Sequence, residues 1–155
     1  MTRWTLVALS AVVLLAPESA AAQAGTPFHV SGTIHGEGMP DLACRGFYYS
    51  HTGSMDSSLG PLGWTGDECV DAIAQPGAFT ITGTFSLDNG LLTGRFEATG
   101  SPETTGQVSE SGTFAITGGS GAYCGASGGG TITIVAQPTA STADVELTGS
   151  LSHRR

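Results

Sequence analysis

The sequence predicts an all-β fold, a small antiparallel barrel of about eight strands, with a β-sandwich as the alternative. Short segments alternate apolar and polar residues with the period of a half-buried strand, turn signals separate them at regular intervals, and no segment has the pattern of a long helix. Only one face of each segment is apolar, and the other carries Thr, Ser, Asp and Glu. A membrane barrel places apolar residues against lipid and polar residues inside. The observed pattern fits a soluble fold better, with the apolar face in a dry interior and the polar face toward water.

The N-terminus predicts a signal peptide over residues 1–22. Arg3 supplies a positive n-region, Leu6 to Ala16 form a short apolar run, and small residues precede a cut between Ala22 and Gln23. A membrane span would need roughly 20 apolar residues, more than this run contains. We therefore expect a secreted or periplasmic protein without membrane insertion.

The remaining chain has the size of one domain. We expect a short leader over residues 23–27, a single β-barrel domain over 28–152 and a frayed tail over 153–155. The formal net charge is −8, and the chain contains no lysine. Such a surface repels phosphate, so we expect no nucleic-acid partner and consider anionic membranes poor partners.

In the first half of the domain the strand signals are weaker. Residues 28–35 alternate apolar and polar side chains, and residues 43–50 are rich in aromatic residues. Residues 69–74 fit either a short strand or one helical turn. Residues 60–66 read as a long loop that contains Trp64. A tryptophan in such a loop either caps a barrel mouth or contacts a ligand, and capping is the favoured interpretation.

The clearest element is a hairpin over residues 79–99. Two alternating segments flank Asn89-Gly90, a strong signal for a type I′ turn because both central positions need positive φ. This turn sets a register in which Leu87 faces Leu92, and each phenylalanine of the hairpin faces a glycine. The predicted pairs are Phe85 with Gly94 and Phe96 with Gly83. Inward glycines either make room for a ligand or serve strand coiling, and coiling is favoured.

Three further strands complete the prediction, around residues 112–116, 130–134 and 145–151. The run from Gly112 to Tyr123, followed by Gly125-Ala126 and Gly128, resembles a signature of the allene oxide cyclase and dirigent-like barrel superfamily. In that signature a strand enters a Gly-Gly-Thr/Ser-Gly turn, then an aromatic residue, then Gly-Ala and a returning strand. The resemblance covers about a third of the domain.

This resemblance implies an eight-stranded barrel with an apolar cavity, a possible homotrimer, and cyclisation or coupling of a reactive apolar substrate. It transfers no catalytic residue, because the matched positions belong to the glycine turn. The side chains expected to line a ligand cavity are aromatic: Phe85, Phe96, Phe114, Tyr123 and Trp64.

Three cysteines in an exported chain imply one disulfide and one remaining thiol. Cys44 and Cys69 flank the loop-rich middle segment, so we expect them to pair. Cys124 lies in the glycine cluster, where we expect a small buried residue rather than a nucleophile.

No other motif predicts a chemistry. Gly125 to Gly129 formally match the G-x-S-x-G elbow, but that motif needs a following helix in a parallel sheet. His29 and His35 lie six residues apart on one predicted strand, too far to share a metal ion. These two histidines and His51 are expected to face solvent, and Asp67, Glu68 and Asp71 to form a solvated acidic loop. We expect no metal and no cofactor.

Three functions remain open. The favoured one is a non-enzymatic exported barrel that binds a small apolar ligand or an extracellular partner. The second is a cyclase, isomerase or dirigent-type barrel, and the third is a structural surface protein. A buried ionisable group lining a cavity would favour the second, and a filled interior would favour the third.

Overall fold

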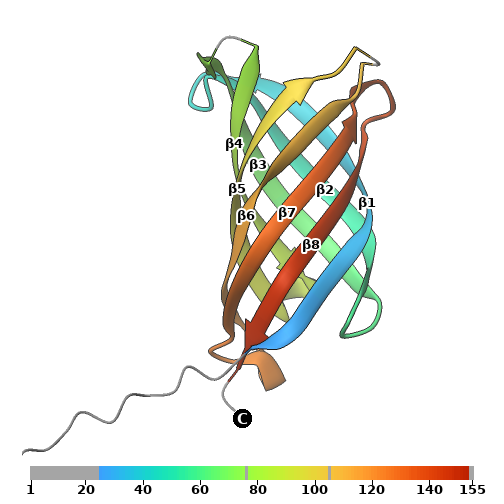
Figure 1. Cartoon of the computed structure of the whole chain (residues 1–155), viewed down its shortest axis with the longest axis vertical. Helices are drawn as coiled ribbons and strands as arrows, with labels where there is room; N and C mark the ends of the chain where they lie inside the picture. Colours follow the sequence, from blue (N-terminus) through green and yellow to red (C-terminus); the bar gives the residue numbers. More distant parts are fainter. Residues whose placement is uncertain (1–24, 76, 105, 154–155) are drawn as a thin grey trace, which may run out of the picture.

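The chain forms a closed barrel of eight antiparallel strands, each paired with the next and the last with the first (Figure 1). This computed structural model describes residues 25–75, 77–104 and 106–153, so the predicted signal peptide lies outside the described residues. The predicted barrel is confirmed, and the sandwich alternative is wrong. The strands are β1 Thr26–Asp41, β2 Gly46–Ser57, β3 Leu62–Gln75, β4 Ala78–Leu87, β5 Leu92–Pro102, β6 Val108–Gly119, β7 Ser127–Gln137 and β8 Thr142–Ser152.

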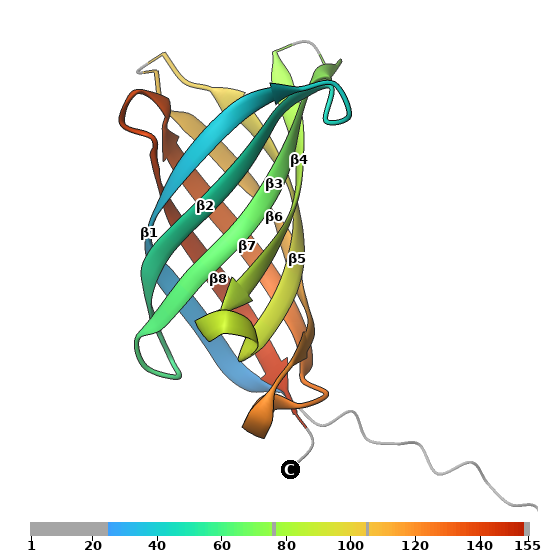
Figure 2. The same cartoon turned by 180° about the vertical axis from the view of Figure 1, so that it is seen from behind.

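The two ends of the barrel differ. At one end, called here the mouth, lie the connections β1–β2, β3–β4, β5–β6 and β7–β8, the last through the 3₁₀ turn η3 Pro138–Ala140 (Figure 1). At the other, called the base, lie the β2–β3 connection and the 3₁₀ turns η1 Asp88–Gly90 and η2 Gly121–Tyr123 (Figure 2). The start of β1 and the end of β8 also lie at the base.

The β4–β5 hairpin has the predicted register. Leu87 pairs with Leu92, and each phenylalanine pairs with a glycine: Phe85 with Gly94 and Phe96 with Gly83. A Cβ on Gly94 would lie 2.2 Å from the Phe85 ring, and one on Gly83 would lie 2.3 Å from the Phe96 ring. The glycines therefore admit the rings, because any side chain at these two positions would occupy the same space.

A tight aromatic core fills the barrel toward its base. The Trp64 and Phe85 rings stack with centroids 5.0 Å apart and planes within 13°. Phe85 meets Phe114 edge-on at 6.3 Å, and Phe28 lies 6.1 Å from Phe114. We call this region the packed half and define it by five aromatic side chains, none more than 4% exposed. They are Phe28, Trp64, Phe85, Phe96 and Phe114.

The third strand corrects two predictions. Residues 62–75 form one continuous strand, so Trp64 lies in β3 and points into the core rather than standing in a loop. The acidic residues predicted to form a solvated loop belong to the same strand. Their alternation explains the correction, because Leu62, Trp64, Glu68 and Val70 point inward and Thr65 and Asp67 point outward. Because Glu68 is acidic yet points inward, the sequence does not show the continuous apolar face expected of a strand.

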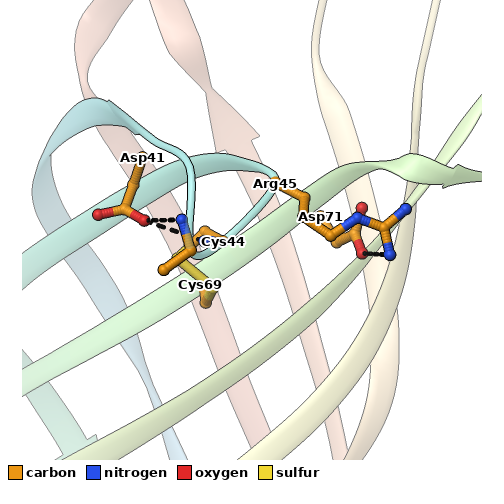
Figure 3. The surroundings of a disulfide bond; sticks show 6 residues. Asp41, Cys44, Arg45, Cys69 and Asp71 are labelled. Carbon is orange, nitrogen blue, oxygen red and sulfur yellow. Dashed lines mark hydrogen bonds and ion pairs between the residues drawn. A yellow bond between two sulfur atoms is a disulfide. The ribbon is translucent and has the colours of Figure 1, made fainter.

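The predicted disulfide between Cys44 and Cys69 is confirmed, with a Cα–Cα separation of 5.2 Å (Figure 3). It ties the β1–β2 turn to β3. Asp41 Oδ1 accepts hydrogen bonds from the backbone N–H groups of Ala43 at 2.7 Å and Cys44 at 2.9 Å. Arg45 lies 3.3 Å from the Asp71 carboxylate. The turn is therefore fixed at three points beside the mouth.

The expectation for the third cysteine is wrong in part. Cys124 is free, as expected, but it is exposed rather than buried. It follows the η2 turn at the base, where the Cys124 N–H bonds to the Gly121 carbonyl at 3.2 Å. The next inward position is Ala126, which is 4% exposed and occupies the core instead.

Candidate functional site

A cavity of about 460 Å³ occupies the barrel toward its mouth. Its position follows from its lining, which includes residues of the β7–β8 connection and the mouth ends of β2, β3 and β6. Most lining side chains are apolar, among them Ile34, Phe47, Val70, Phe79, Val108 and Ile134. We call this region the hollow half. The interior of an eight-stranded barrel can be filled by side chains or leave room for one small ligand. This barrel is filled toward its base and hollow toward its mouth.

Four ionisable side chains also line the cavity: Tyr49 and His51 from β2, Glu68 from β3 and Glu110 from β6. Each pairs across the ladder with a glycine. The pairs are Tyr49 with Gly38, His51 with Gly66, Glu68 with Gly83 and Glu110 with Gly100. Glycine is needed for space at several of these positions, since a Cβ on Gly38 would lie 2.2 Å from the Tyr49 ring and one on Gly100 would lie 2.9 Å from Glu110 Cγ.

His51 is buried at the boundary between the two halves, 5% exposed. The Trp64 indole Nε1–H donates to His51 Nδ1 at 3.2 Å. Because an indole N–H only donates, Nδ1 must accept, and the neutral imidazole carries its proton on Nε2. Nε2 lies 3.4 Å from Glu68 Oε2. The packed half thereby sets the tautomer of a cavity residue, whose Nε2 lies near Glu68 but has no hydrogen-bond partner among the described residues.

Glu110 is the most unusual group of the cavity. It is 8% exposed, and its Oε2 has no hydrogen-bond partner among the described residues. Burial, and secondarily the negative charge of Glu68, raise the pKa of Glu110 to about 8. Burial, followed by the charges of Glu68 and Glu110, also raises the pKa of Tyr49. At neutral pH Glu110 is therefore mostly protonated, and it shares the cavity with a second acidic side chain, Glu68.

A second, more open hollow of about 840 Å³ lies mainly against the outer wall, lined largely by Ser, Thr and charged side chains that alternate outward. It is larger than the inner cavity, yet most of its charged groups are solvated. The inner cavity encloses its polar groups in apolar walls, which is the usual composition of a ligand site. We therefore take the inner cavity as the candidate site.

The five aromatic residues predicted to line a cavity do not line this one. Phe85, Phe96, Phe114 and Trp64 form the packed half, and Tyr123 lies in η2 at the base, with its ring 5.3 Å from that of His153. The aromatic residues that line the cavity are Phe47, Tyr49 and Phe79.

The expectation that the histidines face solvent is right for His29 and His35 and wrong for His51. The solvated loop expected around Glu68 is wrong as well, because the Glu68 side chain is only 13% exposed. Glu110 was not predicted as a site residue. A signal for it was present, since Glu110 shares its side of the strand with Gly112, Phe114 and Ile116.

Comparison with protein-family models, with curated proteins and with solved structures finds no match to this chain. Within the described ranges, no group of three or more His, Cys, Asp or Glu side chains is placed to hold a metal ion. No helix in the described part of the chain is long and apolar enough to cross a membrane.

Proposed function

We propose that the protein is an exported barrel that binds one small, largely apolar ligand in the hollow half. One observation carries this proposal, namely a cavity of about 460 Å³ inside the barrel, partly open to solvent, with largely apolar walls and a few convergent polar groups. Ligand sites typically have volumes of roughly 300–1,000 Å³ and this kind of lining. Export is supported by the predicted signal peptide and by the disulfide, which is typical of oxidising compartments.

The test is native mass spectrometry of the chain after exposure to a lipid and terpenoid extract. We expect a retained mass of a few hundred daltons, on the scale of one drug-sized ligand. The same spectrum gives the oligomeric state, including the trimer that the superfamily resemblance implies.

Two neighbouring positions on β7 give matched variants. Ala136 lines the cavity, and Val135 is 36% exposed on the outer wall. Ala136→Phe should abolish the adduct by filling the cavity, whereas Val135→Phe should leave it. An adduct that survives Ala136→Phe would place the ligand elsewhere and contradict the proposal.

Catalysis is the second candidate, as an isomerase or cyclase acting on a reactive apolar substrate. The observation that favours it is a buried Glu110, with its pKa raised to about 8, in the same cavity as a second acidic side chain, Glu68. A buried acid with a raised pKa can serve as a general acid near neutral pH. Turnover of a fatty-acid epoxide by the purified protein, lost in Glu110→Gln, would support this candidate. The hollow half also weakens the structural-protein alternative, which a filled interior would have favoured.

A further inference from the structure

We infer that the ligand carries an amine, and that its ammonium group binds between Glu68 and Glu110. This inference rests on the proposed ligand-binding function and names the chemical class of the ligand. It starts from an imbalance, because the cavity contains two carboxyl groups and no arginine or lysine among its lining residues.

The cavity offers these acids no arginine or lysine. His51 accepts the indole N–H of Trp64 at Nδ1, and its Nε2 lies 3.4 Å from Glu68 Oε2. Glu110 Oε2 has no hydrogen-bond partner among the described residues. Arg45 lies outside, with a side chain 57% exposed and paired with Asp71. A buried charge usually has an ion partner, and here a bound ammonium would supply it.

The geometry around Glu110 fits such a partner. Its neighbours across the ladder are Gly100 on β5 and Ile134 on β7, neither of which offers a side-chain hydrogen bond. The ionisable groups that face it across the cavity are Glu68, Tyr49 and His51, all from β2 and β3. Glu110 Oε2, which has no hydrogen-bond partner among the described residues, is therefore available as an acceptor in the cavity once the acid is deprotonated.

An ammonium matches these groups better than other polar heads do. Its N–H donors form charge-assisted hydrogen bonds with carboxylates, and the faces of Phe47, Tyr49 and Phe79 can attract its charge. A carboxylate head would be repelled by Glu68. The formal charge of −8 also favours the approach of cations over anions.

Amine binding has a distinctive proton balance. The arriving positive charge favours the ionised form of Glu110, so the proton on Glu110 Oε1 or Oε2 passes to solvent as the ammonium binds. The affinity for an amine therefore rises as the pH approaches 8. A neutral alcohol can accept a hydrogen bond from the protonated acid or donate one to the carboxylate, so its affinity should change much less over the same range.

Titration calorimetry of the wild-type chain with n-octylamine, n-octanol and n-octanoate tests the inference. We expect octylamine to bind at least about tenfold more tightly than octanol at pH 7.5, a difference of about 1.4 kcal/mol. Repeating the titration at pH 7 in phosphate and in Tris should reveal up to about one proton released per amine bound. This measurement needs no variant, so it stands even if a cavity mutation unfolds the barrel.

Variants then locate the amine. Glu110→Gln should lose at least about tenfold of the affinity for octylamine and retain that for octanol. Val135→Phe is the folded control, and Ala136→Phe should block all three ligands. Equal affinity for the three head groups, or proton uptake on amine binding, would overturn the amine inference alone. Failure of all three compounds to bind would overturn both this inference and the proposed binding function.

Discussion

The packed and hollow halves of this barrel use the same local device for opposite purposes. In the packed half, Gly83 and Gly94 give space to Phe96 and Phe85, and the rings fill that space. In the hollow half, Gly38, Gly66 and Gly100 give space to Tyr49, His51 and Glu110, and a cavity remains beside these polar side chains. Cross-strand glycine thus determines where a large side chain can lie, and the paired residue decides whether the interior becomes core or site.

The comparison predicts different costs for the same truncation in the two halves. Phe85→Ala should reduce the free energy of unfolding by about 3–5 kcal/mol, because it leaves a void in a closed core. Phe79→Ala should cost well under half as much, since Phe79 is only partly buried and already borders a cavity. Urea denaturation of the two variants measures both costs. Equal losses would mean that the two halves are packed alike.

The disulfide tests whether the mouth depends on a covalent tie. Cys44→Ser combined with Cys69→Ser should lower the free energy of unfolding by about 3–4 kcal/mol in the chain-entropy model, given a sequence separation of 25. Hydrogen exchange should rise first in the β1–β2 turn and not in the packed half. Cys124→Ser serves as the control, because that thiol is free and exposed and its loss should change neither quantity.

The buried acid of the hollow half should make stability depend on pH. The pKa of Glu110 rises from 4.5 to about 8 on folding, so the folded protein holds the proton that the unfolded chain releases between these values. Stability contributed at low pH is therefore lost as the pH rises across this window, by on the order of a few kcal/mol.

Glu110→Gln isolates this effect, because it removes the titration and keeps the shape of the side chain. The variant should gain stability relative to wild type between pH 5 and pH 8.5, as followed by thermal unfolding at each pH. Glu97→Gln on the outer wall is the control, and its difference from wild type should not grow over that range. A parallel pH profile for wild type and Glu110→Gln would show that Glu110 titrates normally.

The smallest expected effect concerns the hydrogen bond from Trp64 in the packed half to His51 in the hollow half. Trp64→Phe removes the indole N–H donor to His51 Nδ1 and should cost about 1–2 kcal/mol through the lost hydrogen bond and some packing. Its sharper readout is the ¹⁵N NMR spectrum of His51, which should change from the Nε2–H tautomer to a mixture. An unchanged tautomer would mean that Glu68 alone fixes the imidazole.

The β4–β5 hairpin was the most predictable element. Strict alternation and the Asn89-Gly90 turn determine the β4–β5 register, and the observed pairs match it residue for residue. Cys44 and Cys69 also paired as expected. The hairpin prediction rests on turn geometry, and the disulfide prediction rests on the small number of cysteines, which leaves few possible pairs.

The hollow half escaped prediction because its polar residues point inward. Glu68 and His51 interrupt the apolar face of β3 and β2, and a pattern-based interpretation assigns such positions to loops or solvent. Recognising the site required the register of non-neighbouring strands, since Glu110 meets Glu68 only when the barrel closes. Local alternation fails at these positions, as is common where side chains serve a site rather than the core.

The aromatic stack of Trp64, Phe85 and Phe114 lies on the base side of the cavity, next to the lining residue His51. If the cavity binds a ligand as proposed, we expect entry and exit to take place at the mouth. A competitor could then enter only after the occupant has left, so the rate of ligand exchange should not depend on the concentration of competitor.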